Sequence, residues 1–119
     1  MQYLSPEWFN AANEALAVLE LDKQLVVGTT VTSSESVAFN LSLGNSTRLD
    51  PTPSVEPQVS IEYSYETAVA ISKGETNIRE AILAEKINLG GDTIKLAEAS
   101  KDLAKVAKAL EPLSAKTVY

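Results

Sequence analysis

The residues that most often carry out chemistry in proteins are scarce in this chain. It contains no histidine and no cysteine. These two residue types supply most nucleophile–base pairs and most zinc ligands. Without cysteine there is also no disulfide framework and no thiolate metal site. Carboxylate, serine, lysine and tyrosine chemistry remains, so any catalytic site must be built from these groups.

The remaining candidates for acid–base chemistry are explained by local structure. Asp92, Glu80 and Glu7 each lie at the predicted start of a helix, where capping and the helix dipole favour a carboxylate. Tyr63 and Tyr65 could donate a hydrogen bond to a carbonyl group, but tyrosines at a strand end usually pack. We therefore expect no enzyme, no catalytic residue, no metal and no cofactor.

Composition and charge narrow the class of protein. The chain has 119 residues, of which 45% are hydrophobic and 22% charged, which fits one globular domain over 1–119. A net charge of −6 disfavours nucleic acid. Lys101, Lys105 and Lys108 have helical spacing, which fits a solvated helix face or a weak attraction to anionic lipid headgroups. No apolar run is long enough to span a membrane, and the lack of cysteine fits a cytoplasmic location, which we expect.

The first half of the chain predicts one helix followed by strands. Ser5-Pro6-Glu7 is a strong helix start, and the apolar stripe that follows predicts a helix over 5–21. Residues 25–32 and 37–43 alternate with period two, and a short third strand over 46–49 follows a Gly-Asn turn. The three prolines of residues 50–57 predict a loop, and residues 59–64 predict a fourth strand.

The second half predicts two short helices, a strand and a long helix. Ser64 and Asn77 are the expected N-caps of the short helices, and Gly74 suits a left-handed position after the first. We expect Ile78, Ile82 and Leu83 to form the buried face of the second. A strand over 86–89 follows, and Asp92 is expected to cap a helix that runs to Pro112. The fold class is then α+β: a mixed five-stranded sheet with helices on one face, in which the two strands joined by the short helices pair in parallel.

This order of elements resembles the sterol carrier protein type-2-like family, whose sterol-binding domain has such a layout. The similarity is most specific over residues 64–92. It rests on Ser64-Tyr65-Glu66, on Gly74, on Ala81-Ile82-Leu83 and on the strand that closes with Gly90-Gly91-Asp92. The opening Ser5-Pro6-Glu7-Trp8 is similar to small stand-alone bacterial members. Glu85 departs from the pattern, because the family usually has a small residue there, often glycine.

The resemblance implies a non-catalytic carrier of an apolar small molecule, lipid or sterol-like, held in a cavity between sheet and helices. The candidate wall residues, each of which plain core packing also explains, are Phe39, Leu41, Ile82, Leu83, Leu96 and Leu103. We expect Glu85 at the pocket entrance, with the guest's polar head near it, and no stable membrane insertion. The alternative is an interaction or dimerisation module of the same fold. In a homodimer, the edge strand around 46–49 could pair with another chain.

Overall fold

A five-stranded mixed sheet forms the centre of the computed structural model, which describes residues 1–53 and 55–119. The strands are β1 (Leu25–Thr32), β2 (Val37–Leu43), β3 (Arg48–Asp50), β4 (Val59–Ser64) and β5 (Ile87–Gly91). Their order across the sheet is β3-β2-β1-β4-β5, with β1 and β4 parallel and the other neighbours antiparallel. The predicted α+β class with a mixed five-stranded sheet is thereby confirmed.

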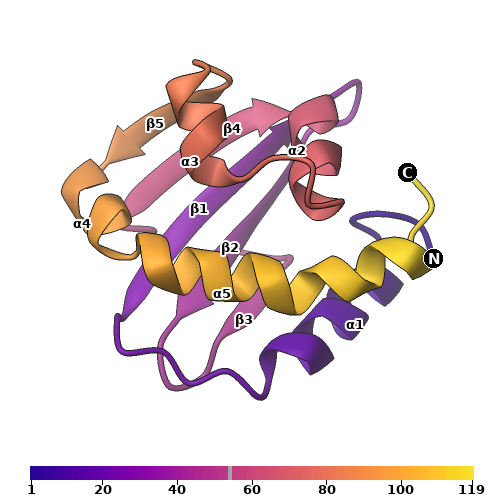
Figure 1. Ribbon diagram of the computed structural model, residues 1–119, viewed down its shortest axis with the longest axis horizontal. Coiled ribbons are helices and arrows are strands. Elements are labelled where there is room, and N and C mark those ends of the chain that lie inside the picture. Colours follow the sequence, from indigo (N-terminus) through magenta and orange to yellow (C-terminus); the bar gives the residue numbers. More distant parts are fainter. Residues whose placement is uncertain (54) are drawn as a thin grey trace.

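The helices form a second layer on one face of the sheet (Figure 1). They are α1 (Pro6–Leu16), α2 (Tyr65–Ser72), α3 (Ile78–Leu83), α4 (Thr93–Glu98) and α5 (Ser100–Leu110), and a 3₁₀ helix, η1 (Glu111–Lys116), follows α5. Both termini lie together beyond the end of α5 (Figure 1). No helix within the described residues is long and apolar enough to cross a membrane.

Local signals in the sequence predicted the helix starts correctly. The Ser5 side chain accepts a hydrogen bond from the Trp8 backbone N–H, and Ser64 and Asn77 cap α2 and α3 in the same way. Gly74 has the expected positive φ, 77°, after the end of α2. These caps depend only on neighbouring residues, and this explains why the sequence was sufficient to find them.

The predicted parallel pairing of the last two strands is wrong. β4 and β5 are antiparallel, with Tyr63 opposite Ile87, and the parallel partner of β4 is β1. α2 and α3 carry the chain away from one end of β4 and bring it back to the same end, so the next strand must run in reverse. The proline-containing loop before β4 makes the crossover to the far side of β1.

Two helix boundaries also differ from the prediction. The first helix ends at Leu16 instead of reaching residue 21, because the Leu21 N–H donates to the Gly44 carbonyl at 3.0 Å and draws the chain towards the turn after β2. The long last helix is divided at Ala99 into α4 and α5. No glycine or proline marks that break, so the sequence offered no signal for it.

The face of the sheet opposite the helices is largely polar. The proline-containing loop lies over part of it, where the Asn40 side-chain amide donates to the Val55 carbonyl at 2.8 Å. A Cβ on Gly28 would lie 2.7 Å from Pro57, so glycine lets this loop approach β1. The apolar core is therefore confined to the space between sheet and helices.

The edge strand β3 is not free to pair along its outer side. The Asn13 side chain, from α1, accepts from the Leu49 N–H at 2.7 Å and donates to the Leu49 carbonyl at 3.0 Å. Both outward backbone groups of the central residue of β3 are thus satisfied within the chain. Pairing of another chain along residues 46–49 would have to displace this amide.

Candidate ligand-binding space between the sheet and the helices

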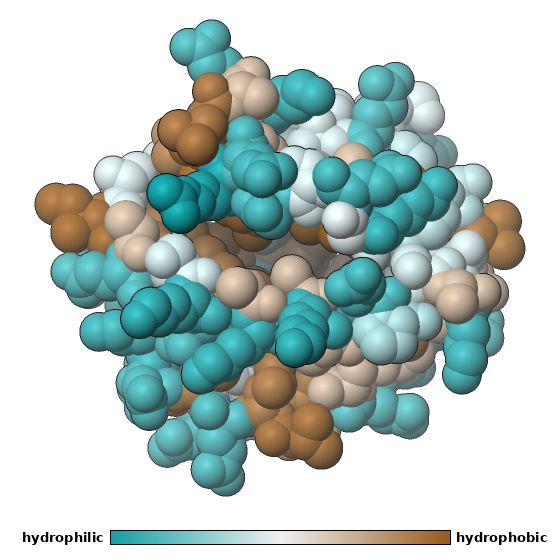
Figure 2. Space-filling model, viewed as in Figure 1, coloured by the Kyte–Doolittle hydropathy of each residue, from teal (hydrophilic) through white to brown (hydrophobic). Residues whose placement is uncertain are grey.

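The helix-covered face is hollowed near its centre, between α5 on one side and α2 and α3 on the other (Figure 2). The two sides meet at one end, where a Cβ on Gly74 would lie 2.9 Å from the Glu111 carboxylate. Positions 107 and 104 lie one and two helical turns before Glu111 on the same side of α5, and both are alanine. Small side chains thus border this central hollow along α5, and apolar residues lie at its depth (Figure 2).

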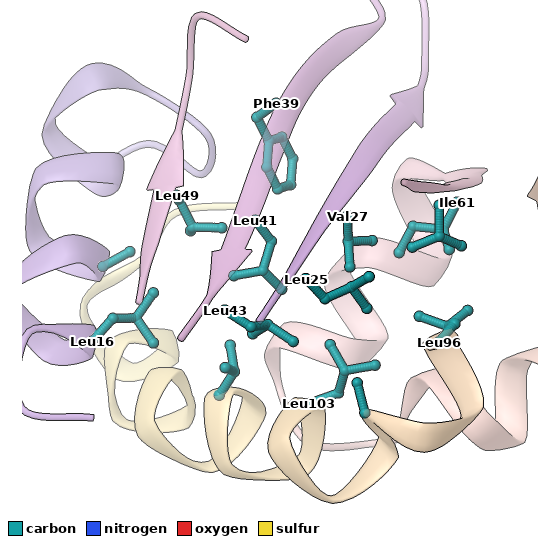
Figure 3. Close-up of a cluster of buried hydrophobic side chains, with 14 of the residues drawn as sticks. Leu16, Leu25, Val27, Phe39, Leu41, Leu43, Leu49, Ile61, Leu96 and Leu103 are labelled. Carbon is teal, nitrogen blue, oxygen red and sulfur yellow. The ribbon is translucent and has the colours of Figure 1, made fainter. Parts of the chain in front are cut away.

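Most of the predicted wall residues lie in the apolar core between the sheet and the helices. Phe39, Leu41, Leu96 and Leu103 are all buried in one apolar cluster. Leu96 and Leu103 point from the helical layer towards Val27 and Ile61 of the sheet (Figure 3). Ile82 is half-buried and packs against the same cluster. The structure therefore brings five of the six predicted residues together in or against one apolar core, and their role in ligand binding stays a prediction.

Leu83 does not join the others. Its side chain is 75% exposed, and the residue that α3 buries completely is Ala81. The expectation that Leu83 belongs to the buried face of this helix is wrong. Leu83 is two residues after the buried Ala81, so it lies about 200° from Ala81 around the helix axis and faces solvent. Ile78 and Ile82, on either side of Ala81 in the helical projection, are half-buried instead.

Glu85 is an exposed residue just after α3. Its backbone is left-handed, with φ 59°. The Lys86 N–H, on the next residue, donates to the Ala81 carbonyl at 2.9 Å and closes the end of the helix. This is the position after a helix at which glycine is favoured, because a Cβ strains the left-handed conformation. The left-handed backbone therefore accounts for a preference for glycine at this position, and no ligand contact is needed to explain it.

We predict that Glu85→Gly stabilises the fold by about 0.5–1 kcal/mol. Relief of left-handed strain contributes about 1–2 kcal/mol, and the more flexible unfolded glycine chain offsets part of it. Glu85→Ala is the matched control, because it removes the charge and keeps the strain. Urea denaturation should show a gain for glycine alone, and an equal gain for alanine would assign the effect to the charge.

A cluster of aromatic rings lies where the two termini of the chain meet. We call Tyr3, Trp8, Phe9, Tyr65 and Tyr119 the aromatic cluster. The Tyr3 ring centroid lies 5.0 Å from that of Trp8, 5.9 Å from Tyr65 and 5.0 Å from Tyr119. Trp8 contacts Phe9 at 5.3 Å, and Phe9 contacts Phe39 on β2 at 5.4 Å. The sequence pattern gave no sign of this cluster, since its members come from both ends of the chain and from α2.

The hydroxyl groups near the aromatic cluster are poorly hydrated. Burial raises the pKa of Tyr3, and the neighbouring Tyr63 raises it further. Burial alone raises the pKa of Tyr63, which lies on β4. The Tyr3 hydroxyl donates a long hydrogen bond, 3.4 Å, to the Ala68 carbonyl. Burial thus disfavours the ionised form of both phenols, and the region favours uncharged groups over ions.

The carboxylates considered for acid–base chemistry lie at helix starts as predicted. The Asp92 side chain accepts from the Lys95 N–H at 3.2 Å and caps α4, while Glu80 and Glu7 lie in the first turns of α3 and α1. Asp102 was not considered from the sequence. It is buried and accepts from the Lys23 N–H at 3.2 Å, which ties α5 to the segment before β1.

Two pockets open at opposite ends of the sheet. One, of about 400 Å³, lies near the start of β1 and is lined by residues such as Gln24, Asn45 and Gln58. The other, of about 310 Å³, lies at the end of β4 between Glu66, Thr76 and Lys86. Neither is lined by any of the predicted wall residues. They do not coincide with the apolar space predicted from the sequence.

Comparison with solved structures identifies the architecture. The chain superposes on a crystal structure of sterol carrier protein 2 with a TM-score of 0.68, at 19% identity, covering 92% of this chain and 99% of the other. Palmitated sterol carrier protein 2-like 2 from Aedes aegypti gives 0.66 at 19% identity, covering 83% and 94%. Sterol carrier protein 2 from Aedes aegypti, in complex with the C16 fatty acid palmitate, gives 0.62 at 16% identity, covering 87% and 97%.

These similarities are structural. No protein-family model matches the chain, and no curated protein sequence matches it significantly. The superposition on sterol carrier protein 2 covers 92% of this chain, so it takes in most of the sheet and of the helical layer. The chain therefore has the sterol carrier protein 2-like fold.

Proposed function

We propose that the protein is a non-catalytic carrier that holds a lipid or sterol-like molecule between its sheet and its helices. The observation that carries the proposal is the central hollow, which opens over aliphatic core residues in a fold shared with structures that contain palmitate (Figure 2). Each methylene of a guest buried there gains about 0.8 kcal/mol. A chain of about eleven or more buried methylenes would therefore supply roughly the 8 kcal/mol that micromolar binding requires.

The charges around the space favour an uncharged guest. Glu85 and Glu111 lie near the ends of α3 and α5, and the chain as a whole carries a net charge of −6. The exposed lysines of α5 (Lys101, Lys105 and Lys108) lie on the side of the helix opposite its buried residues, in contact with solvent. Neutral alcohols or sterols should consequently bind better than free fatty acids.

We predict that Ile82→Trp weakens binding of an environment-sensitive fluorescent lipid about tenfold. The larger side chain would occupy the space of about two methylenes, each contributing about 0.8 kcal/mol. Leu83→Trp is the matched control, because the neighbouring side chain is 75% exposed and points outwards. The measurement is a titration of lipid-free protein, with circular dichroism to show that both variants are folded.

The control separates a binding space from a general surface effect. Equal losses for both variants would contradict binding at the central hollow. No saturable binding by folded, lipid-free wild-type protein would overturn the carrier proposal and leave the interaction module. That module would then need an edge other than β3, where Asn13 satisfies the backbone of Leu49. Sedimentation equilibrium would measure self-association directly.

A further inference from the structure

The indole of Trp8 has an unsatisfied hydrogen-bond donor. Its side chain is only 4% exposed, yet its Nε1–H meets no acceptor among the described residues. Buried tryptophan N–H groups usually find a partner, because losing hydration without replacement is unfavourable. This donor therefore calls for an acceptor that the described chain does not provide.

The surroundings of Trp8 show what kind of acceptor would fit. The rings of Tyr3 and Phe9 pack against the indole at 5.0 and 5.3 Å, both nearly perpendicular to it. Phe9 in turn contacts Phe39, one of the predicted wall residues, so the aromatic cluster is continuous with the apolar core. An acceptor reaching Trp8 through this region must be attached to an apolar body.

The acceptor should also be uncharged. Burial raises the pKa of the nearby Tyr3 and Tyr63 phenols, which shows that a negative charge is disfavoured in this region. The cation that touches the cluster, Lys73, lies over the Tyr119 ring at 5.1 Å from its centroid, and the Tyr119 hydroxyl pairs with the Ser72 hydroxyl. A carboxylate would lose its hydration here, whereas a hydroxyl or carbonyl oxygen loses much less.

We infer that Trp8 donates a hydrogen bond to a neutral oxygen, hydroxyl or carbonyl, of the bound guest, whose polar end enters the aromatic cluster. This inference rests on the proposed carrier function and adds a specificity residue to it. It places the polar end inside the molecule, in contrast to the expectation from the sequence that the polar end lies beside Glu85. The apolar tail would then extend along the core towards the central hollow.

The only tryptophan of the chain makes a direct test practicable, because a single indole N–H signal arises from Trp8. Lipid-free ¹⁵N-labelled protein is titrated with 1-dodecanol and with 1-chlorododecane, which has the same chain and no strong acceptor. Dodecanol should move the indole proton downfield and slow its exchange with solvent, and chlorododecane should do neither. Binding of both probes is measured independently by displacement of the fluorescent lipid.

A variant gives the energetic counterpart. Trp8→Phe should weaken dodecanol binding about 2- to 12-fold, the equivalent of one hydrogen bond of about 0.5–1.5 kcal/mol, and leave the affinity for chlorododecane nearly unchanged. If both probes bind and the indole signal responds alike to each, the inference is overturned while the carrier function stands. If neither probe binds and the fluorescent lipid does not bind either, the carrier function itself fails. The experiment on wild-type protein decides the matter even if Trp8→Phe does not fold.

Discussion

Replacing Leu103 by alanine is expected to lower the free energy of unfolding by about 2–5 kcal/mol. Leu103 lies on α5 with 8% of its surface exposed and points towards the sheet beside Leu96 (Figure 3). The truncation removes buried methyl groups and leaves a cavity that the surrounding strands cannot fill completely. Because a domain of this size is stabilised by about 5–15 kcal/mol, the effect should be plain in urea denaturation at unchanged m-value.

The same substitution at an exposed site provides the control. Leu83→Ala removes the same atoms from a side chain that is 75% exposed, so its effect should stay within about 0.5 kcal/mol. The contrast tests whether α5 packs on the sheet and whether Leu83 lies outside the core. A loss below about 0.5 kcal/mol for Leu103→Ala would mean that the helix does not pack there. A loss of 2 kcal/mol or more for Leu83→Ala would return that residue to the core.

The parts of the fold that the sequence predicted are those set by neighbouring residues. The alternation of residues 37–43 predicted β2 because it separates a core face from a solvent face, and Phe39, Leu41 and Leu43 are indeed buried. The N-caps were likewise predictable, because each depends on one side chain and the backbone three residues later. The direction of β5 was not predictable in this way, since it depends on the end of the sheet to which the connection through α2 and α3 returns the chain.

The candidate site shows the same division. Phe39, Leu96 and Leu103 were found because amphipathic periodicity identifies residues that face the core. The aromatic cluster was missed because Tyr3 and Tyr119 meet only after the two ends of the chain come together, where the Val118 N–H donates to the Met1 carbonyl. Leu83 was misplaced since a six-residue helix is too short for periodicity to fix its buried face.

Gly91→Ala is the second substitution for which a large loss is expected, about 2–5 kcal/mol. Gly91 ends β5 with φ 73°, a left-handed conformation that costs a residue with a Cβ about 1–2 kcal/mol. A Cβ there would also lie 2.6 Å from the Gln58 carbonyl oxygen and 3.1 Å from the Val59 Cα. These are backbone atoms of the paired strand, so relief requires β4 and β5 to separate, which adds about 1–3 kcal/mol.

Gly90→Ala, one residue earlier, distinguishes backbone constraint from mere crowding. Its Cβ would also come within 2.6 Å of another atom, but that atom is the Ser60 Oγ, on a side chain that can rotate away. Gly90→Ala should therefore cost no more than about 1 kcal/mol. In a Ser60→Ala background, which removes that oxygen, the loss should nearly vanish, while the loss for Gly91→Ala should persist. Thermal and urea unfolding of both glycine variants in the two backgrounds, with wild type and Ser60→Ala alone as references, measure both effects. If Gly91→Ala cost less than about 0.5 kcal/mol, the chain would not need a left-handed turn to pass from β5 into the Asp92 cap, where the Asp92 N–H donates to the same Gln58 carbonyl at 2.9 Å.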